Sequence, residues 1–320
     1  MNYNNVHSKK AITKIQSVLL MTIVIVACVV GGVIYYYTAF LPSQQVVLTI
    51  TIGSKRFTEQ YILGHMVAEL IERNTPYKVI RKVGLGGTAI CHEALVKGDI
   101  QIYVEYTGTG LLAILKMSWT PGTSPDQIYQ IVKDEYEKRW GITWLSPLGF
   151  SNTYCLAMRK DLAEALKVKK ISDLAPYADK LRFGGTAEFE TRPDGYPGLT
   201  QTYGFTFREY VAMDPGLMYI ACAQGEVDVI SAFSTDARIA AYNLTVLEDD
   251  KLFFPPYHAC ILVRNDLLAK APELKTLLTK LAGKIDDATM TNLNYQVDVE
   301  KKDPSQVARE FLEKIGLIPK

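Results

Sequence analysis

The stretch that decides the fold reads Val104-Glu105-Tyr106-Thr107-Gly108-Thr109-Gly110. It follows a short β-type segment, Ile100-Gln101-Ile102-Tyr103, and precedes an apolar run, so it is predicted to be a strand-to-helix loop. In an open α/β sheet, such loops border the crevice beyond the carboxyl ends of the strands, where ligands bind. The glycines let a ligand approach the backbone, which makes Tyr106 and Thr109 candidate ligand contacts. An ordinary turn with a surface tyrosine is the alternative that this loop alone leaves open.

Outward from this loop, strand and helix patterns alternate along the chain. Strands are predicted at 46–52, 79–83, 143–149, 153–158, 181–185, 227–233 and 258–264. Helices are predicted at 62–71, 88–97, 124–140, 161–167, 217–224, 272–282, 286–302 and 305–314, with Thr88 as an N-cap and Ser124 opening a capping box. This alternation predicts an α/β fold with largely parallel sheets, and two sheets fit residues 46–320 better than one.

Composition excludes some classes of protein. The chain has 320 residues, of which 48% are hydrophobic and 22% are charged, and its net charge is +1. This is ordinary globular composition with enough length for two domains of modest size. A nucleic-acid-binding protein would carry a basic excess or a basic stripe, and no run rich in Lys or Arg occurs. We therefore expect no nucleic-acid partner.

The N-terminal segment differs from the rest of the chain. Lysines occur at positions 9, 10 and 14, no charged residue occurs from 15 to 54, and residues 18–40 are almost wholly apolar. An apolar stretch of this length can span a bilayer, and lysines on its leading side place the N-terminus inside and the bulk of the chain outside. We expect residues 1–45 to be a cytoplasmic N-tail, a membrane anchor and a linker, with the remainder at the outer face of the cytoplasmic membrane.

Cys28 leaves a second reading of this segment open. Ile25-Val26-Ala27-Cys28 resembles a lipoprotein signal box, in which Cys28 would be lipidated after cleavage. The apolar run continues for about a dozen residues beyond Cys28, longer than a lipoprotein signal requires, which favours an uncleaved anchor. The other cysteines, at 91, 155, 222 and 260, are widely spaced and are expected to be buried free thiols, although a disulfide among them stays open.

The sequence carries no arrangement that suggests an enzyme. Its four histidines are scattered, and it has neither a nucleophile elbow nor a phosphate-binding loop. The glycines at 84, 86 and 87 do not have the spacing of a dinucleotide fingerprint. Glu188 and Glu190 are expected to be exposed carboxylates without a catalytic role. We expect no catalytic residue, no metal and no cofactor.

Aromatic residues beside loop signals are more informative. Tyr154 begins a predicted strand, Phe233 ends one, and Tyr257 follows two prolines before another. Residues 191–198 have the composition of a rigid loop headed by Arg192, and Lys55 follows the first strand. Each ring alone is more often core or turn packing than a ligand contact. Together they place aromatic side chains at strand ends, with two candidate cations.

Several of these segments resemble one known family. The matching segments, in family order, are Gly53-Ser54-Lys55-Arg56-Phe57-Thr58-Glu59-Gln60, Gly84-Leu85-Gly86-Gly87-Thr88, Glu105-Tyr106-Thr107-Gly108-Thr109, Asn152-Thr153-Tyr154, Arg192-Pro193-Asp194-Gly195, Phe233-Ser234-Thr235-Asp236 and Phe254-Pro255-Pro256-Tyr257. On these segments, the sequence resembles the substrate-binding proteins of osmoprotectant ABC transporters, the glycine betaine, carnitine and choline-binding family. The resemblance covers residues 46 to 320, and it favours the ligand-contact reading of the opening loop.

The resemblance implies a two-lobed, periplasmic-binding-protein-like (type II) fold with two crossover connections, which closes over its ligand. Lobe I would hold residues 46–151 plus 254–320, and lobe II would hold residues 152–253. The family's aromatic box around a quaternary ammonium would consist here of Tyr106, Tyr154, Phe233 and Tyr257. Its carboxylate contacts would fall on Lys55, Thr109 and Arg192, with Asn152 beside the box. Phe233 departs from the tyrosine common in the family.

Elementary chemistry supports such a site. A trimethylammonium group has no N–H to donate, whereas each aromatic face attracts it by about 0.5–2 kcal/mol. A micromolar site requires about 8 kcal/mol, so the box needs carboxylate contacts as well. Glycine betaine is therefore the first candidate, followed by proline betaine and carnitine. Choline lacks the carboxylate, so it would leave the two cations unpaired and bind more weakly.

The resemblance also implies partners. The closed form would be offered to an ABC permease that is driven by an ATPase, and neither subunit is in this chain. An osmolyte-sensing domain that reports to a signalling protein, a choline-preferring binding protein and an enzyme acting on quaternary amines are the alternatives. The last would need a metal, flavin or nucleophile that the sequence does not suggest.

Overall fold

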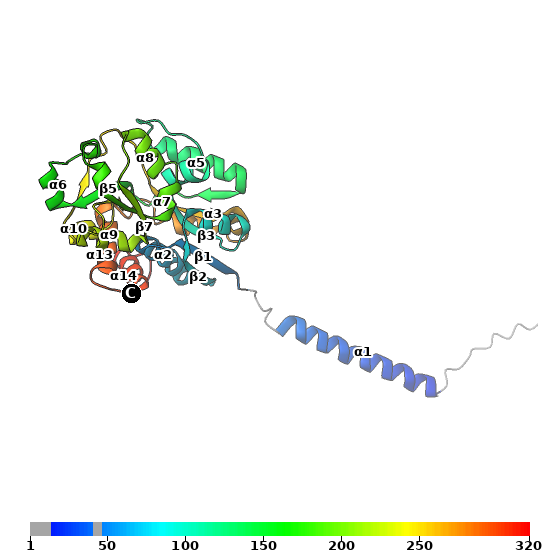
Figure 1. Cartoon of the computed structure of the whole chain (residues 1–320). Coiled ribbons are helices and arrows are strands. Elements are labelled where there is room, and N and C mark those ends of the chain that lie inside the picture. Colours follow the sequence, from blue (N-terminus) through cyan, green and yellow to red (C-terminus); the bar gives the residue numbers. More distant parts are fainter. Residues whose placement is uncertain (1–13, 41–46) are drawn as a thin grey trace, which may run out of the picture. The chain divides into compact units, whose positions relative to one another are not determined.

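The computed structural model describes residues 14–40 and 47–320, which belong to two separate compact units, 1–47 and 48–320. In the first unit, α1 (Lys14–Phe40) is a single helix, and its segment Gln16–Tyr36 is long and apolar enough to cross a membrane (Figure 1). A signal sequence would satisfy the same criteria of length and composition. The predicted N-tail up to residue 13 and the linker 41–45 lie outside the described residues.

The second unit contains two five-stranded sheets, each covered by helices. The first sheet has the order β2-β1-β3-β10-β4, with β1 (Thr49–Lys55), β2 (Lys78–Gly86), β3 (Ile102–Tyr106), β4 (Ile142–Trp144) and β10 (Ala259–Arg264). Helices that belong with it are α2 (Thr58–Asn74), α3 (Thr88–Lys97), α4 (Thr107–Thr109), a π-helical turn (Gly110–Ile114), α5 (Pro125–Trp140), α11 (Asn265–Lys270), α12 (Glu273–Thr279), α13 (Asp287–Asp298) and α14 (Pro304–Lys314). We call this sheet and its helices lobe I.

The second sheet has the order β7-β6-β8-β5-β9. Its strands are β5 (Tyr154–Arg159), β6 (Arg182–Gly185), β7 (Glu209–Ala212), β8 (Val229–Phe233) and β9 (Leu244–Leu247). Its helices are α6 (Lys160–Leu166), α7 (Ala187–Thr191), α8 (Tyr196–Tyr203), α9 (Pro215–Gln224) and α10 (Arg238–Ala241), with 3-10 turns at Ile171–Leu174 and Ala178–Lys180. We call this sheet and its helices lobe II. The chain passes from lobe I to lobe II between β4 and β5 and returns between β9 and β10.

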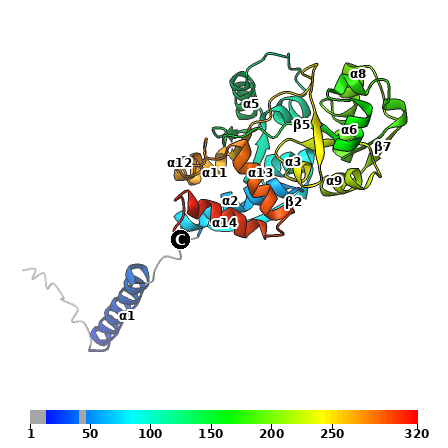
Figure 2. The ribbon, with the colours of Figure 1, turned by 90° about the vertical axis from the view of Figure 1, so that its left-hand side faces the viewer.

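The C-terminal helices close lobe I from below in the orientation of Figure 2. There α14 lies along α2, the helix that follows the first strand. Its buried residues, Val307, Ala308, Phe311 and Leu312, recur at helical spacing and face the core. The last helix is therefore part of the lobe that begins the unit, although about 240 residues separate the two helices.

The prediction of largely parallel sheets holds for four of the five strands in each sheet, and one strand in each sheet runs antiparallel to its neighbours. In lobe I, β1 pairs in parallel with β2 and β3, but β10 runs antiparallel to β3 and β4. In lobe II, β5 is likewise antiparallel to β8 and β9. The two antiparallel strands are the ones that the chain enters directly from the other lobe. They start at the end of the sheet where their neighbours finish, so they run in the opposite direction.

Short elements account for most of the other differences. Strands β7 and β9, each of four residues, and helices α10 and α11 were not predicted. The stretch 191–198 is not one rigid loop, because α7 ends at Thr191 and α8 begins at Tyr196. Strand β4 is Ile142–Trp144, so only residues 143 and 144 of the predicted strand 143–149 are in it. The capping box at Ser124 is confirmed, with the Ser124 side chain and the Gln127 side chain each bonding the other's backbone N–H.

The predicted state of the cysteines is confirmed for three positions. Cys91, Cys222 and Cys260 are buried free thiols. Cys155 is a free thiol of intermediate exposure, and Cys28 is exposed on α1. Burial raises the pKa of the Cys91 thiol to about 12, so this cysteine behaves as a small apolar side chain within the core of lobe I.

Candidate ligand-binding site

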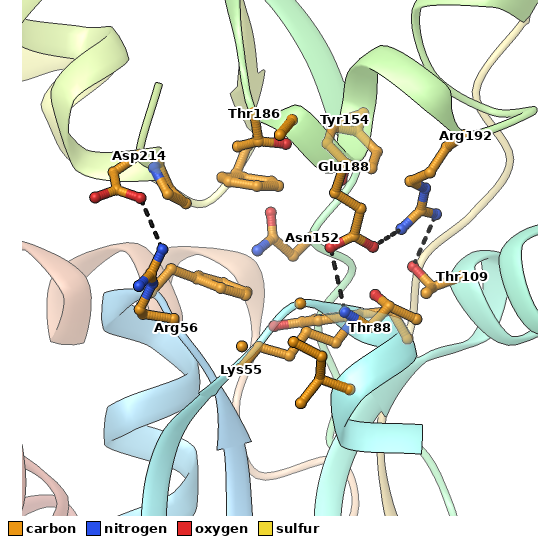
Figure 3. Close-up of a pocket in the computed structure, with 18 of the residues that line it drawn as sticks. Lys55, Arg56, Thr88, Thr109, Asn152, Tyr154, Thr186, Glu188, Arg192 and Asp214 are labelled. Atoms are coloured by element: carbon orange, nitrogen blue, oxygen red, sulfur yellow. Dashed lines mark hydrogen bonds and ion pairs between the residues drawn. The ribbon is translucent and has the colours of Figure 1, made fainter. Parts of the chain in front are cut away.

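A cavity of about 510 Å³ lies between the two lobes. Its wall includes all eight residues that the sequence predicts as ligand contacts: Lys55, Tyr106, Thr109, Asn152, Tyr154, Arg192, Phe233 and Tyr257. Figure 3 shows this cavity with the polar side chains of both lobes pointing into it. The ninth predicted position, Cys28, belongs to α1 and the other unit.

Strand register explains why these aromatic residues meet. Tyr154, the first residue of β5, is paired with Phe233, the last residue of β8. In lobe I, Tyr106 at the end of β3 is paired with Ala259 at the start of β10, and Tyr257 stands two residues before that. Strand ends of both sheets therefore open onto the same space, and the rings at those ends line it.

The rings form a continuous wall. The centroid of the Tyr154 ring lies 5.2 Å from that of Phe233 and 5.7 Å from that of Tyr257. Phe57, which the sequence analysis did not single out, stacks on Phe233 at 5.2 Å with an angle of 12° between the ring planes, and lies 6.4 Å from Tyr106. Phe57 follows Lys55 and Arg56 at the same strand end, and that position is the signal that could have identified it.

Lys55 is buried and already has an anionic partner. Its Nζ donates to Oε1 of Glu105 over 2.5 Å, and the Glu105 side chain is fully buried. Nζ also lies 5.0 Å from the centroid of the Tyr106 ring. Glu105 belongs to the stretch that opened the sequence analysis, but only the fold shows that it neutralises Lys55.

Arg192 is also engaged within the protein. Its Nε donates to Oδ1 of Asp194 over 2.8 Å and its Nη2 donates to Oδ2 of the same carboxylate. Nη2 further donates to Oγ1 of Thr109, and Nη1 donates to Glu188 over 2.9 Å. Asp194 additionally accepts the hydroxyl proton of Tyr257 over 2.7 Å. The bidentate face of the guanidinium, expected to receive a ligand carboxylate, therefore holds Asp194 in this structure.

Glu188 was predicted to be an exposed carboxylate without a role, but the structure gives it partners in the cavity. It lines the cavity, and its Oε2 accepts the backbone N–H of Thr88, the first residue of α3, over 3.2 Å. Gly87 allows this approach, since a Cβ there would lie 2.5 Å from Oε2. Burial alone would raise the pKa of Glu188, but Arg192, Lys55 and the Thr88 N–H outweigh it and lower the pKa.

The predicted N-cap at Thr88 is consequently one residue off. The N-cap is Gly87, which has no side chain with which to bond the free N–H groups of the helix. Glu188 supplies the missing acceptor from the other lobe. A negative charge at a helix N-terminus is favourable. Since Glu188 belongs to lobe II and α3 to lobe I, this favourable contact helps to hold the two lobes together. No local pattern around residue 88 could reveal it.

Glu59 is the buried centre of a second network. Its Oε1 accepts from the Tyr106 hydroxyl over 2.7 Å and from the Asn152 amide over 2.9 Å. Its Oε2 accepts from the hydroxyl of Thr235 over 2.6 Å and from the amide of Asn294 over 3.2 Å. Burial raises the pKa of Glu59, although each of these hydrogen bonds lowers it. Glu59 thus positions two residues of the cavity wall, Tyr106 and Asn152.

Contacts between the two lobes border the cavity, and those drawn in Figure 3 come from both of its sides. Arg56 donates to Asp214 over 2.9 Å, with both side chains largely exposed. The Thr88 N–H donates to Glu188, and Arg192 donates to Thr109 over 3.3 Å. Each joins an element of lobe I to one of lobe II, so the structure has the lobes drawn together.

The chain is similar to known transport binding proteins. A carnitine transport binding protein of Listeria monocytogenes, OpuCC, is 39% identical over 268 residues, which are 83% of this chain and 86% of that protein. An ergothioneine transport permease/ergothioneine binding protein of Helicobacter pylori strain G27, EgtU, is 40% identical over 269 residues, 84% of this chain. The matched region is 48% of that protein, so this chain corresponds to about half of it.

A solved structure has the same fold. A crystal structure described as that of a glycine betaine/carnitine/choline ABC transporter superimposes with a TM-score of 0.67 at 38% sequence identity, covering 84% of this chain and 99% of that one. The model of the OpuAC family matches residues 48–314, which include both lobes and every cavity residue. The chain therefore belongs to the OpuAC family, the substrate-binding domain of ABC-type glycine betaine transport systems.

Proposed function

We propose that this protein captures a quaternary ammonium betaine in the cavity between its lobes and delivers it to the permease of an ABC importer. Its family consists of substrate-binding components of such importers, and not of enzymes. The observation that carries the proposal is the wall of aromatic rings, Tyr106, Tyr154, Phe233, Tyr257 and Phe57, on one cavity that both lobes line.

The rings supply what a trimethylammonium group requires. Such a group cannot donate hydrogen bonds, so only charge and the negative faces of aromatic rings distinguish it from other cations. Tyr154 contributes its ring and stays neutral, since burial raises the pKa of its phenol well above the ordinary value. The ring centroids of Phe233 and Tyr257 lie 5.2 and 5.7 Å from that of Tyr154, so the three rings form a surface and not an isolated contact.

The carboxylate of a betaine would meet Lys55 and Thr109. Lys55 uses one of its three N–H donors on Glu105, and Thr109 accepts from Arg192 while its own hydroxyl proton stays available. Arg192 would contribute a remaining N–H of Nη1 and its charge, since Asp194 holds the bidentate face. The ligand carboxylate is therefore bound more weakly than it would be by an arginine whose bidentate face is free.

The names of the relatives narrow the ligand class. Carnitine and ergothioneine, for which two relatives are named, are both trimethylammonium betaines. Glycine betaine, named in the family's description, is the smallest member of the same class. The shared chemistry is a quaternary ammonium and a carboxylate in one molecule, and we propose this chemistry for the ligand here.

Calorimetric titration tests the proposal. Full-length protein in a maltoside detergent, which carries no quaternary ammonium, is titrated with glycine betaine, carnitine, ergothioneine, choline and proline. We expect at least one betaine to bind with a Kd at or below the micromolar range and to bind more tightly than choline. Phe233→Leu should weaken that binding about 2- to 30-fold, the equivalent of one aromatic face.

Phe205→Leu is the matched control, because Phe205 packs on Tyr203 and Phe207 in lobe II and does not line the cavity. It should leave the affinity unchanged. Binding of no quaternary amine would refute the proposal. Equal losses of betaine affinity in the two variants would show that the ring of Phe233 does not contact the ligand and affects binding only by stabilising the fold.

The N-terminal helix accords with the extracytoplasmic location of such binding proteins. We propose that α1 anchors the protein, with the binding unit at the outer face of the cytoplasmic membrane. Protease treatment of intact cells should then digest the binding unit while the protein fractionates with membranes. Mass spectrometry of the mature N-terminus separates this anchor from a lipoprotein, in which the chain would begin at a lipidated Cys28.

A further inference from the structure

We infer that the buried carboxylate of Glu59 is the counter-charge for the quaternary ammonium group of the ligand, and that it acts across the ring of Tyr106. This inference rests on the proposed function and deepens it, because it assigns recognition of the positive charge to a residue behind the cavity wall. Glu59 does not itself line the cavity. Its influence on the ligand therefore passes through the residues that do.

Glu59 has no cationic partner in the part of the chain that the structure describes. It is only 2% exposed. Its four hydrogen bonds come from neutral groups, the hydroxyls of Tyr106 and Thr235 and the amides of Asn152 and Asn294. A buried charge is ordinarily paired with an opposite one, because burying an isolated charge is costly. A ligand on the other side of the wall can supply the cation that Glu59 lacks.

The charges nearest to Glu59 on the side away from the cavity do not compensate it. Glu59 shares a small pocket with Asp236, Arg238 and Asp298. The Nη2 atom of Arg238 lies 2.6 Å from Oδ2 of Asp236 and 3.5 Å from Oδ2 of Asp298. Three carboxylates thus share one guanidinium, so this pocket carries a surplus of negative charge.

The same pocket adjoins the ligand cavity. Phe57, Asn152 and Phe233 line both spaces and therefore separate the carboxylates from the ligand. Tyr106 makes the direct connection, since its ring lines the cavity while its hydroxyl donates to Oε1 of Glu59 over 2.7 Å. A hydrogen bond to a carboxylate polarises a phenol, and the negative face of its ring then attracts a cation more strongly.

Lys55 does not take the place of the ligand cation. Its Nζ lies 5.0 Å from the centroid of the Tyr106 ring, but it also lies 2.5 Å from Oε1 of the buried Glu105. Lys55 and Glu105 form a pair that is neutral as a whole. The charge of Glu59 is therefore left for the ligand to balance.

Proton binding by Glu59 should be coupled to ligand binding. Burial raises the pKa of Glu59 in the structure without ligand. A bound ammonium group favours the charged carboxylate and so lowers this pKa. Binding of a betaine should then release a proton wherever free Glu59 still holds one, and the affinity should rise with pH over that range.

A charged ligand and its uncharged isostere test the inference. Glycine betaine and 3,3-dimethylbutanoate have the same shape and the same carboxylate, and they differ in the carbon atom that replaces the charged nitrogen. γ-Butyrobetaine and 5,5-dimethylhexanoate form a second pair for a cavity that favours a longer ligand. Calorimetric titration of the full-length protein in maltoside at neutral pH gives the affinity ratio within each pair. This ratio measures recognition of the positive charge and not of shape.

Variants assign the charge recognition to Glu59. Glu59→Gln should lower the ratio roughly tenfold, the order expected for two charges on opposite sides of one ring, while the affinity for the isostere changes less than threefold. A mere shift of the Tyr106 ring would weaken both ligands equally. Glu72→Gln is the control, because Glu72 is on the same helix α2 and does not line the cavity, so the ratio should stay unchanged.

Tyr106→Phe is a second variant, which keeps the ring and removes the hydroxyl that joins it to Glu59. It should also lower the ratio. Loss of one donor disfavours the charged carboxylate, so the rise of betaine affinity should move to higher pH. Thermal melts identify any variant that has lost its fold, and the two variants check each other.

Proton release gives an independent readout. Calorimetry of the tightest-binding betaine from acid to neutral pH, in buffers of different ionisation enthalpy, measures the number of protons released. Glu59→Gln should abolish both the release and the rise of affinity with pH. Asp298→Asn is the control and should retain both, because burial also raises the pKa of Asp298 but Arg238 lies beside it.

The outcomes separate this inference from the proposed function. An unchanged ratio in Glu59→Gln, with betaine still bound by wild type, would overturn the inference and leave the proposed function standing. Proton release that persists in Glu59→Gln and disappears in Asp298→Asn would also overturn it. A reduced ratio without proton release supports it, since Glu59 would then be ionised before the ligand arrives. Failure of every betaine to bind would remove the proposed function itself.

Discussion

Arg192 and Asp194 form a two-point ion pair inside the protein, with Nε donating to Oδ1 over 2.8 Å and Nη2 donating to Oδ2. Their side chains are 6% and 0% exposed. The residue that the sequence identifies as a carboxylate clamp thus reaches the cavity already neutralised. A second consequence is that Asp194 holds Tyr257, whose hydroxyl donates to the same oxygen. The stability of this part of the site depends on Asp194.

We predict that Asp194→Asn destabilises the protein by about 3 kcal/mol, since removing one partner of a buried ion pair leaves the other charge uncompensated. Urea unfolding at neutral pH measures this loss. Asp214→Asn is the control, because Asp214 and Arg56 are 63% and 62% exposed, and an exposed pair contributes at most about 1 kcal/mol. A smaller loss in Asp194→Asn than in Asp214→Asn would contradict the assignment.

Gly108 allows Tyr257 to occupy its position in the cavity wall. A Cβ at residue 108 would lie 2.8 Å from two carbons of the Tyr257 ring and 2.9 Å from the carbonyl oxygen of Pro256. Gly108→Ala should therefore displace the ring and weaken betaine binding about tenfold, the equivalent of roughly 1.4 kcal/mol.

Gly110→Ala is the matched control for this effect. A Cβ there would lie 2.8 Å from the Trp144 ring, which belongs to the core of lobe I and not to the cavity. Both substitutions should lower the melting temperature, but only Gly108→Ala should lower the affinity per folded molecule. Equal affinities in the two variants would show that Tyr257 is not a ligand contact.

The residues of this site that could be predicted from the sequence are those at the ends of predicted strands. Tyr106, Tyr154 and Phe233 stand where an apolar segment stops or starts, and the register of the sheets carries them to one place. The segment between β9 and β10, with two prolines before Tyr257, gives a similar signal. These positions could be predicted because local pattern and final location coincide.

The partners of those residues could not be predicted in the same way. Glu59 meets Thr235, a residue 176 positions away, and the N-terminus of α3 is capped by Glu188, 100 positions away. Such contacts depend on how the two lobes face each other, which no local pattern encodes. The one antiparallel strand of each sheet was missed for a related reason, since the direction of β5 and β10 follows from the crossings between lobes.

Phe57 provides a test of the aromatic wall at a residue outside the resemblance-based box. Its ring stacks on Phe233 with 12° between the planes. Phe57→Leu keeps an apolar side chain but removes the aromatic face, so betaine binding should weaken about 2- to 30-fold in calorimetric titration. Phe253→Leu is the control, since Phe253 packs on Phe254 and does not line the cavity. Unchanged affinity in Phe57→Leu would exclude this ring from the wall.

Glu59 predicts a pH dependence of stability with a definite sign. Burial raises its pKa above the ordinary value of 4.5, so the native state holds the proton more tightly than the unfolded chain does. The resulting stabilisation is complete below the unfolded pKa and is lost as the pH rises through the raised native pKa. Glu59→Gln cannot ionise, and it also replaces one acceptor oxygen by an amide that faces the donors of Thr235 and Asn294.

At acid pH, wild type should therefore exceed Glu59→Gln in free energy of unfolding by about 1–3 kcal/mol, the cost of mispaired buried groups. The difference should shrink as the pH rises from 4.5 towards neutrality, because wild type then carries a buried charge that the variant lacks. Urea unfolding at several pH values measures this difference in free energy of unfolding.

The pH dependence for Glu93→Gln should have the opposite sign. The hydrogen bond from Lys97 lowers the pKa of the exposed Glu93, so any stabilisation that Glu93 contributes is lost as the pH falls. A difference for Glu59 that grows with pH would show that its four donors stabilise the charged carboxylate more than burial disfavours it.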